Sequence, residues 1–459
     1  MVPQILRVAC RGSRLSRIQT EEALSAIQPL LPRETQFQVT HFETPGDRDK
    51  NTPLTDPNVP DDFFTRDIDQ ALLRGEVDLA VHSAKDIPKT PAPGLAVATL
   101  LPGRDSRDAL ICRVDWDGKT PPKVIGTSSP RRAEEIQRLF PGAQTVPLRG
   151  TIDERLEQLD DEACDAVIVA ACALERLGLS HRISDFLPYE TAPMQGRLAV
   201  IARSDAEELI FLLKPSDFRM QLLDGTLAER PRPPAMIPPG KPATLYVGTN
   251  PDHFQGCEPL IHWPVIGLFP RPRAERVKVL SATLGSVRGV LFASPFAVRC
   301  FVDALMHWED GRTLHGKILL AAGPSTAREI EQMGFQASVA PATFAGLDAL
   351  LAKMDGVLAG LYLYPCSDAA PTDARVIDAA KRGVQLMAFA FYENKPLSPG
   401  PLPSVPFSQV LFTSPSTVTA YFTNYPDEVK SNRTWLAIGP STLEALGQKG
   451  LKGVMVNGQ

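Results

Sequence analysis

The chain has 459 residues, of which 43% are hydrophobic, so several globular domains fit within it. Its net charge of −5 means that no overall basic field exists to hold nucleic acid. Its seven cysteines include no C-x-x-C pair, which argues against a disulfide framework or a zinc ribbon and predicts no metal site. No apolar run approaches the ~20 residues of a membrane span and no signal peptide is visible, so we expect a cytoplasmic protein.

The first half alternates between short apolar runs of strand length and stretches with helical spacing, as in an α/β fold. We predict strands at 6–10, 36–42, 77–81, 95–101, 124–126, 145–148 and 165–170, and helices at 16–31, 64–73, 131–139, 172–177 and 204–213. A further helix, which carries Arg155, is predicted to open at 149–151. Two polar segments interrupt this pattern. Residues 44–62 are expected to form a mobile loop of the length that often serves as a lid, and residues 102–108 form a polar crossing.

Asp86 follows the carboxyl end of the predicted strand at 77–81. The stretch after His82 is polar, and Pro88 prevents a helix from passing through it. Open α/β sheets bind ligands at the carboxyl ends of their strands, which makes Asp86 a candidate site residue. The alternative is that Ser83 and Asp86 only bond to the amides of a turn.

Arginines recur at the starts of the predicted helices. Arg11 precedes the first helix, and Arg131 and Arg132 follow Ser129, a natural cap, and Pro130, which suits the first helical position. Cations at this end oppose the helix dipole at a cost of roughly 0.3–1 kcal/mol unless an anion lies between them. Because guanidinium groups pair with carboxylates at two points, we expect a ligand with several carboxylates; the alternative is that these arginines are solvated.

Four motifs stand in the order found in hydroxymethylbilane synthase, also called porphobilinogen deaminase. The resemblance covers roughly the first 215 residues. It implies two periplasmic-binding-protein-like α/β domains, residues 1–101 with 196–216 and residues 102–195. The motifs are Arg11-Gly12-Ser13, Val81-His82-Ser83-Ala84-Lys85-Asp86-Ile87-Pro88, Gly126-Thr127-Ser128-Ser129-Pro130-Arg131-Arg132 and Leu148-Arg149-Gly150.

The same resemblance implies that Asp86 is the catalytic residue and that the substrate is porphobilinogen, a pyrrole with an acetate and a propionate. It also implies a dipyrromethane cofactor, which the family attaches as a thioether to a cysteine of a third domain. The residues implied to bind substrate or cofactor are Arg11, Ser13, Ser83, Lys85, Thr127, Ser128, Ser129, Arg131, Arg132, Arg149, Arg155 and Arg176.

The chain departs from the family pattern in three places. Residues 59–64 replace the glycine- and lysine-rich end of the family's loop, and Met194 and Arg197 occupy positions that the family fills with glycine and alanine. After the helix at 204–213 too few residues remain before the next pattern for a third domain, and residues 217–242 read as a stiff proline-rich linker. The family's usual cofactor anchor is therefore missing. Cys257 only faintly resembles it.

The second half contains an internal repeat. Residues 291–298 recur at 411–418, and residues 321–326 recur at 437–442. Each copy has the pattern of a strand, a helix, a second strand and a second helix. The repeat therefore predicts two similar α/β lobes. Each helix start presents amides and hydroxyls that could hold acidic groups. The alternative is that these are ordinary helix caps.

From Lys241 onward the paired motifs resemble uroporphyrinogen-III synthase, a two-lobed α/β enzyme. The resemblance implies one lobe of residues 243–268 with 394–459 and another of residues 269–393. Tyr392 could instead be a core residue. The cleft contacts implied by position are Ser294, Thr326, Tyr392, Ser414, Ser441 and Thr442.

Together the two resemblances predict a bifunctional enzyme that polymerises porphobilinogen to hydroxymethylbilane and cyclises it to uroporphyrinogen III. Asp86 would stabilise a cationic methylene-pyrrole and move protons. We expect small pyrrole substrates and no nucleic acid, membrane or obligatory protein partner. One alternative is a tetrapyrrole-binding first half beside an active synthase half, and another is a two-lobed solute-binding protein, although export would require a signal peptide.

Overall fold

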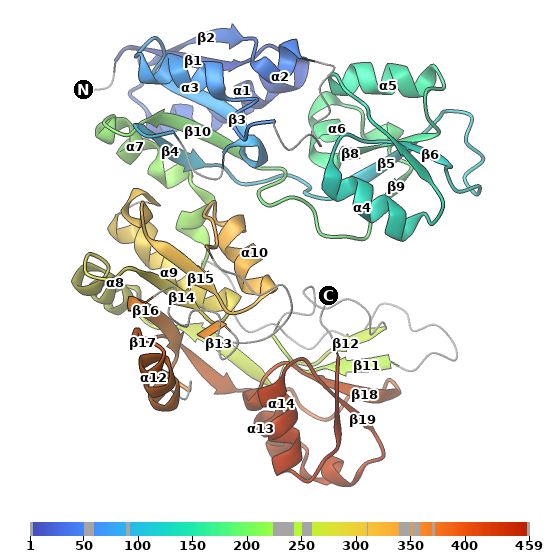
Figure 1. Cartoon of the computed structure of the whole chain (residues 1–459), viewed down its shortest axis with the longest axis vertical. Coiled ribbons are helices and arrows are strands. Elements are labelled where there is room, and N and C mark those ends of the chain that lie inside the picture. The colour runs from blue at the N-terminus through green and yellow to red at the C-terminus, as the bar shows by residue number, and fades with distance from the viewer. Residues whose placement is uncertain are drawn as a thin grey trace. The chain divides into compact units, whose positions relative to one another are not determined.

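A computed structural model describes residues 3–49, 59–88, 92–223, 243–249, 259–309, 311–338, 350–351, 359–369 and 372–456. The chain divides into two compact units, residues 1–220 and 221–459, and each contains two five-stranded sheets covered by helices (Figure 1). In the described part of the chain, no helix is long and apolar enough to cross a membrane. The α/β class predicted from the sequence is confirmed.

The first sheet has the order β2-β1-β3-β10-β4, with β1 parallel to both neighbours and β10 antiparallel to both of its own. Alternating side chains supply two cores: α1 and α7 cover one face, and α3 covers the other. The elements are β1 (Ile5–Arg11), α1 (Arg14–Ile27), β2 (Gln36–Phe42), α3 (Arg66–Leu73), β3 (Leu79–Ser83), β4 (Leu95–Leu100), β10 (Leu198–Arg203) and α7 (Glu207–Leu213).

The second sheet has the order β7-β6-β8-β5-β9 and lies in the same unit. Its strand β8 is buried along its whole length, as expected for an apolar strand covered on both faces. The elements are β5 (Asp108–Cys112), β6 (Val124–Gly126), α4 (Pro130–Leu139), β7 (Gln144–Val146), α5 (Ile152–Asp160), β8 (Ala166–Ala170), α6 (Ala171–Leu177) and β9 (Asp185–Phe186).

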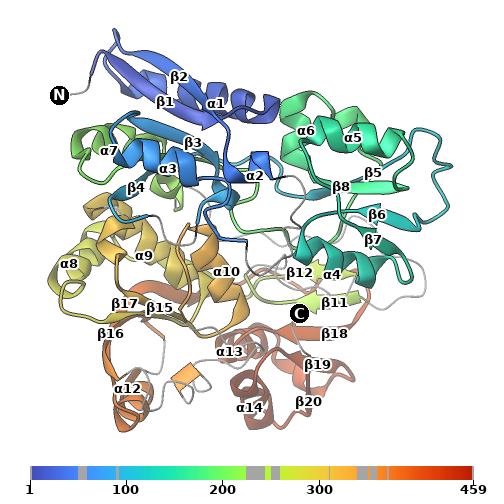
Figure 2. The same cartoon turned by 45° about the horizontal axis from the view of Figure 1, so that its top comes forward.

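The chain crosses between these two sheets twice, from β4 to β5 and from β9 to β10. Helices α1 and α6 pack against each other where the two sheets meet (Figure 2). The turns that follow β1, β3, β6 and β8 all line one cavity. Four strand ends from two sheets therefore meet at one site, as expected for ligand binding in open α/β sheets.

The second unit has sheets of order β12-β11-β18-β19-β20 and β13-β17-β16-β14-β15. The first contains β11 (Ala243–Tyr246), β12 (Leu260–His262), β18 (Phe407–Phe412), α13 (Pro415–Asn424), β19 (Thr434–Ala437), α14 (Pro440–Gln448) and β20 (Gly453–Met455). The second contains β13 (Ile266–Pro270), α8 (Arg273–Thr283), β14 (Gly289–Phe292), α9 (Pro295–Trp308), β15 (Ile318–Ala321), α10 (Pro324–Gln332), β16 (Gly360–Ser367), α12 (Thr372–Lys381) and β17 (Val384–Pro396).

The internal repeat is confirmed, because β14-α9-β15-α10 and β18-α13-β19-α14 follow the predicted order. Ser294 and Ser414 cap α9 and α13 with their side chains. The antiparallel strands β13 and β17 pair within the second of these sheets, and the lobe boundaries proposed at residues 268 and 393 fall inside them. Asn394 of β17 donates its side-chain amide to the Ser416 hydroxyl of α13 at 3.0 Å.

Most predicted elements of the first half are present, with ends shifted by a few residues, but the strands β5, β9 and β10 and the short helix α2 were not predicted. The polar crossing at 102–108 leads directly into β5, and the predicted loop at 44–62 contains α2 (Pro45–Arg48). The linker prediction was wrong at its start. Asp217 is buried and accepts a hydrogen bond from the Leu100 amide at 2.9 Å, while residues 224–242 and Cys257 lie outside the described residues.

Candidate active site

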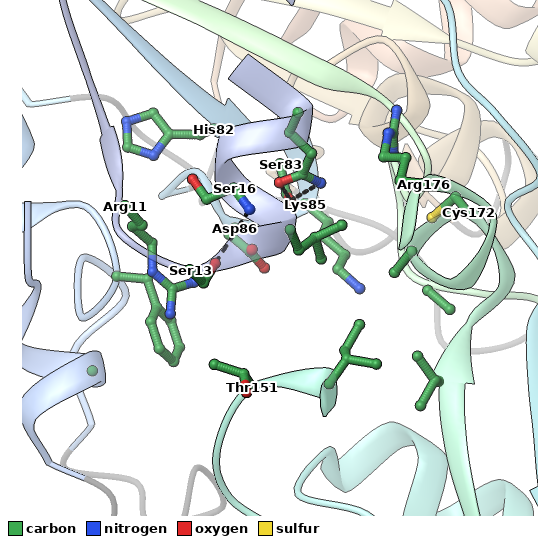
Figure 3. Close-up of a pocket in the computed structure, with 18 of the residues that line it drawn as sticks. Arg11, Ser13, Ser16, His82, Ser83, Lys85, Asp86, Thr151, Cys172 and Arg176 are labelled. Atoms are coloured by element: carbon green, nitrogen blue, oxygen red, sulfur yellow. Dashed lines mark hydrogen bonds between the residues drawn. The ribbon is translucent and has the colours of Figure 1, made fainter. Parts of the chain in front are cut away.

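The first unit contains a cavity of about 790 Å³ between its two sheets, within the ~300–1,000 Å³ typical of small-molecule sites. All the site residues predicted for this half line it except Thr127, which is buried and accepts a hydrogen bond from the Ser129 amide at 3.2 Å. Figure 3 shows several of them around one space, with Asp86 and Lys85 on one wall and Thr151 on another.

Asp86 ends the single 3-10 turn η2 (Ala84–Asp86) that follows β3. Its side chain is half-buried on the cavity wall, and none of the described residues hydrogen-bonds its carboxylate. A buried carboxylate with a structural role would be bonded to the protein. The Asp86 oxygens are therefore available to a ligand. This favours a functional role for Asp86 over the alternative that it only bonds to the amides of a turn.

The neighbouring Lys85 is an exposed residue that lines the cavity, and its ammonium donates to the Gln195 side-chain oxygen at 3.1 Å. Surrounding protein and the nearby Arg132 guanidinium lower the pKa of the Lys85 ammonium. An anionic ligand beside Lys85 would restore the charged form, because opposite charges favour ionisation.

The cavity wall is strongly positive although the whole chain is negative. Nine Arg and Lys side chains line it against four Asp and Glu side chains, while the net charge of the chain is −5. Burial and the nearby Arg132 and Arg149 lower the pKa of Arg155 to about 10. Arginine stays charged even so, and the neighbouring Arg132 and Arg149 among the causes of this shift add positive charge that suits a polyanionic ligand.

Arg131 and Arg132 meet at Asp108, a fully buried carboxylate at the start of β5. Each guanidinium reaches an Asp108 oxygen at 2.6 Å, and the Tyr189 hydroxyl donates to the same carboxylate at 3.2 Å. The sequence argument required an anion at the start of α4. In this structure the Asp108 carboxylate supplies an anion at this helix start, and ligand binding by Arg131 and Arg132 stays a prediction.

Gln195 connects this cluster to the turn that holds Lys85 and Asp86 and was missed by the sequence analysis. Its amide nitrogen donates to Asp108 at 2.9 Å, and its oxygen accepts from Lys85. Asp108 and Gln195 lie at the ends of the two crossings between the sheets. The polar crossing Pro102–Asp108 was the only sequence signal, because the partners of Asp108 are distant in the chain.

Arg11 and Arg149 both hold the segment that contains α2. Arg11 pairs with the Asp47 carboxylate and lies over the Phe64 ring at 4.6 Å, while Arg149 donates to the Asp49 carbonyl at 2.6 Å. Thr44 begins α2 with a capping box to Asp47. Two arginines predicted to bind substrate therefore contact the predicted lid segment instead in this structure.

Arg176 also has a protein partner. Its side chain is almost fully buried, pairs with Glu22 of α1 at 2.9 Å and donates to the Gly196 carbonyl at 3.0 Å. This arginine therefore ties α6 to α1 and to the return crossing. In that crossing Met194 has a φ of 58°, a left-handed conformation that favours the family's glycine.

The predicted hydroxyl groups mainly organise the turns. Ser13 and Ser129 cap α1 and α4, as predicted for Ser129. Ser83 bonds to Gln19 of α1 at 2.8 Å, and Ser128 donates to the Leu148 carbonyl. A ligand that approaches these residues meets turns already fixed by the protein.

In the second unit, the structure brings together only one pair of the predicted cleft residues. The hydroxyls of Ser294 and Tyr392 are 2.9 Å apart, and Tyr392 is buried against Phe296 with a pKa raised by burial. Thr326 and Thr442 are buried in the first turns of α10 and α14. Ser441 is exposed, and the hydroxyl oxygens of Ser414 and Ser416 are 2.8 Å apart.

Comparisons with known proteins identify the first half. Residues 6–210 match the family model described as porphobilinogen deaminase, dipyromethane cofactor binding domain. A probable porphobilinogen deaminase of Pyrobaculum islandicum is 37% identical over 232 residues, covering 49% of this chain and 76% of the relative. The chain belongs to the porphobilinogen deaminase family. The deaminase of Chromobacterium violaceum is 37% identical over 251 residues, covering 53% of this chain and 81% of the relative.

The half that follows this deaminase half matches a second family. Residues 255–458 match the model described as uroporphyrinogen-III synthase HemD, so the predicted fusion is confirmed. A mutant uroporphyrinogen III synthase from Thermus thermophilus is 19% identical with a TM-score of 0.36, covering 47% of this chain and 92% of that chain. The uroporphyrinogen-III synthetase of Helicobacter pylori is 16% identical with a TM-score of 0.32, covering 47% and 92%. The assignment of this synthase half rests on the family model.

The deaminase cavity fits the dipyrromethane cofactor that its family model names. Nε2 of His82 and Nε of Arg149, two residues that line the cavity, are buried with no partner among the described residues, which is uncommon for buried polar atoms. Arg131, Arg132 and Arg155 supply cations for the carboxylates of such a ligand.

Proposed function

We propose that the chain catalyses two successive steps of haem biosynthesis. The deaminase half polymerises porphobilinogen to the linear hydroxymethylbilane, and the synthase half cyclises this product to uroporphyrinogen III while inverting its last ring. The observation that carries the first reaction is the Asp86 carboxylate, which no described residue hydrogen-bonds and which lies on the wall of a cavity lined by cations.

In the first reaction, Arg131, Arg132, Arg155 and Lys85 bind the acetate and propionate groups of the substrate. Loss of ammonia from the aminomethyl group leaves positive charge on the methylene-pyrrole, and the Asp86 carboxylate stabilises this charge and accepts the pyrrole proton. The half-buried position of Asp86 strengthens this interaction because few water molecules screen it. The dipyrromethane cofactor, when bound, supplies the pyrrole carbon to which the first substrate is joined.

In the second reaction, the synthase half holds one conformation of the linear chain so that the ring closes in one way. Ser294 and Tyr392 are the residues we propose for contact with the substrate in the second lobe, because their hydroxyls meet at the start of α9. Thr326, Ser414, Ser441 and Thr442 occupy the equivalent helix starts.

An Asp86→Asn variant tests the first reaction. Ammonia release and porphobilinogen consumption are expected to fall at least about 100-fold, because general acid–base groups contribute ~10²–10⁴-fold. The thermal midpoint should remain unchanged, since no described residue bonds this carboxylate. Asp161→Asn, on the exposed end of α5, is the matched control. Full activity of Asp86→Asn would contradict the assignment.

The wild-type chain distinguishes the main alternative. If the protein leaves porphobilinogen unchanged but converts supplied hydroxymethylbilane to uroporphyrinogen III, the deaminase half is a tetrapyrrole-binding module. Release of ammonia together with the type III isomer supports two active halves.

We also propose a cytoplasmic location. The six cysteines within the described residues are all free thiols, as expected in a reducing compartment. Measurement of the protein in separated cell fractions tests this location.

A further inference from the structure

The position of Asp86 depends on the contacts that hold the backbone of a single 3-10 turn, which this residue ends. The hydrogen bond that closes the turn, from the Ile87 amide to the Ala84 carbonyl, is long at 3.4 Å. No described residue hydrogen-bonds the Asp86 carboxylate. The contacts that fix the candidate catalytic residue must therefore come from outside this turn.

Arg197 supplies one of these contacts through its backbone. Its carbonyl oxygen accepts a hydrogen bond from the amide of Ala84, the first residue of the turn, at 3.0 Å. Arg197 immediately precedes β10, whose first residue Leu198 pairs with Ser83 at the end of β3. The return crossing between the sheets therefore places Arg197 directly beside the turn that contains Asp86.

The side chain of Arg197 packs between the first crossing and a segment that follows α7. Its guanidinium carbon lies 3.5 Å from the centre of the Phe218 ring, where the negative face of the ring attracts the cation. Its stem lies against Gly103, at which an added Cβ would be 3.1 Å from Cγ of Arg197. The alanine that the resemblance implies at position 197 could make the backbone bond but could not reach the ring.

Phe218 belongs to a segment that is firmly attached to the first sheet, although it follows residue 210, where the match to the deaminase model ends. It begins η5 (Phe218–Gln221) and packs against the core cluster that contains Ala84 and Leu100. The preceding Asp217 is buried, accepts from the Leu100 amide at 2.9 Å and pairs with the buried Arg219 at 2.7 Å. Phe218 is therefore a fixed support for the Arg197 side chain.

The backbone next to Arg197 is strained and needs such a support. Met194 has a left-handed φ of 58°, and its carbonyl accepts from the Arg197 amide at 3.0 Å. An unfavourable backbone conformation persists only where the surrounding structure holds it. Met194 and Phe218 pack against the same core cluster, so the support for this strained turn comes from the segment after α7.

We propose that Arg197 and Phe218 form a brace that positions Asp86 for the deamination of porphobilinogen. Phe218 fixes the Arg197 side chain, and the Arg197 carbonyl fixes the Ala84 amide at the start of the turn. Both members of the brace are positioning residues, because they act on the reaction through the backbone that carries Asp86. This inference rests on the proposed deaminase function and adds to it the contact that holds its acid–base group.

Two variants of Phe218 separate the ring contact from simple packing. Phe218→Leu keeps an apolar side chain in the core but removes the ring, whereas Phe218→Tyr keeps the ring. We expect kcat for ammonia release to fall about tenfold in the Leu variant and to stay within about twofold in the Tyr variant, since a 1 Å misplacement can cost ~10²-fold. KM for porphobilinogen should change by less than about threefold, because Arg131, Arg132 and Arg155 are held by other helices.

A double-mutant cycle tests whether the two residues act as one unit. Arg197→Ala and Phe218→Ala should each lower kcat about tenfold, and the double variant should lose about the same factor instead of the ~100-fold expected of independent sites. A rise in KM with unchanged kcat in Arg197→Ala would mean that its guanidinium binds the substrate, and would overturn the brace.

Arg107 is the matched control, because it makes the same two kinds of contact elsewhere. Its guanidinium carbon lies 3.6 Å from the centre of the Phe186 ring, and its carbonyl accepts from the Ala171 amide at 2.9 Å. Arg107 does not line the cavity, so Arg107→Ala should keep kcat within about twofold of wild type. A tenfold loss in this variant would show that the kinetic effect is not specific to the brace.

Hydrogen exchange provides a readout that does not depend on activity. The Ala84 amide is protected by its bond to the Arg197 carbonyl, so loosening of the brace should expose it. In Phe218→Leu, the Ala84 amide is expected to exchange about tenfold faster than in wild type, while the amides of β8 should exchange at the wild-type rate. Equal protection of Ala84 in the two proteins would overturn the brace.

The results distinguish failure of the brace from failure of the proposed function. Wild-type kcat in Phe218→Leu, or a ~100-fold loss in the double variant, would reject the brace and leave the deaminase function intact. A wild-type protein that releases no ammonia would reject the function, and the exchange of Ala84 would still decide the brace. The thermal midpoint of each variant, measured in parallel, separates a local loss of position from misfolding.

Discussion

Individual residues of the deaminase half show how a negative chain builds a positive site. Arg131 and Arg132 share the buried Asp108, so one carboxylate fixes two cations and leaves net positive charge for a ligand. Although burial opposes ionisation, the Arg132 and Arg131 guanidinium groups hold the pKa of Asp108 well below its usual range. A buried carboxylate with these partners stays ionised at any pH where the protein works.

Asp108→Asn is therefore expected to destabilise the protein by roughly 3–5 kcal/mol at pH 7, because it leaves buried Arg132 without its counter-charge. The carboxylate contributes stability above an unfolded pKa of ~3.9, and this contribution is lost as the pH falls below it. Urea unfolding between pH 3 and 7 measures both effects. The variant should also raise KM for porphobilinogen more than it lowers kcat, since Arg131 and Arg132 lose their orientation.

Asp105→Asn, three residues earlier in the same crossing, is the matched control. Its carboxylate pairs with Arg107 at the surface, where such pairs contribute ~0–1 kcal/mol. Equal losses of stability in the two variants would contradict a special role for Asp108.

Among the elements, α3 contains a carboxylate whose environment is unfavourable. Asp69 is buried on the sheet side of this helix and accepts from the Thr65 hydroxyl at 2.8 Å. Burial and the nearby Asp62 raise the pKa of Asp69 to about 6. The folded protein therefore keeps this proton to a higher pH than the unfolded chain does, and stability falls as the pH rises from ~3.9 to 6.

Asp69→Asn should remove this loss, because an amide carries no charge and still accepts from Thr65. The variant is expected to gain up to about 3 kcal/mol of stability at pH 7 relative to wild type and little at pH 4. Denaturant unfolding at the two pH values measures the difference. Asp67→Asn is the control, because it loses only a surface pair with Arg48 and should change stability by less than ~1 kcal/mol at both pH values. An effect of Asp69→Asn that does not depend on pH would contradict the explanation by the raised pKa of Asp69.

At the scale of the whole molecule, the two reactions belong to separate units. Residues 1–220 contain the deaminase cavity, and residues 221–459 contain both synthase sheets. No predicted site residue of one reaction lies in the unit that carries the other. Damage to one active site is therefore expected to leave the other reaction intact.

Two full-length variants test this independence. Asp86→Asn should still convert supplied hydroxymethylbilane to the type III isomer within about twofold of the wild-type rate, because uncoupled distant sites act additively. Tyr392→Phe should release ammonia from porphobilinogen at the wild-type rate but form the type III isomer at least about tenfold more slowly, since it removes the hydroxyl paired with Ser294. Chromatography of the oxidised porphyrin isomers measures the second reaction.

The outcome for Tyr392→Phe also separates its two roles. A core tyrosine would lose roughly 1 kcal/mol of stability with its hydrogen bond and leave the isomer ratio unchanged. A residue that contacts the substrate would change the ratio in a protein of near wild-type stability.

The sequence by itself determined the order of elements, the repeat and the position of Asp86. Apolar periodicity, caps such as Ser129 and the proline at position 130 act over a few residues, so they can be read along the chain. Motif order was also sufficient to name both families, and the structure places most of the residues predicted for the deaminase half on the wall of one cavity.

Only the tertiary structure decided what each charged side chain contacts. Asp108 joins Arg132 from 24 residues away and Gln195 from 87 residues away, and nothing in the local pattern of β5 reports such partners. Cys172 looked like an ordinary residue of a short apolar helix until the fold placed it on the cavity wall. Electrostatic and hydrogen-bond partners depend on distances between elements, and these distances are fixed only when the sheets pack.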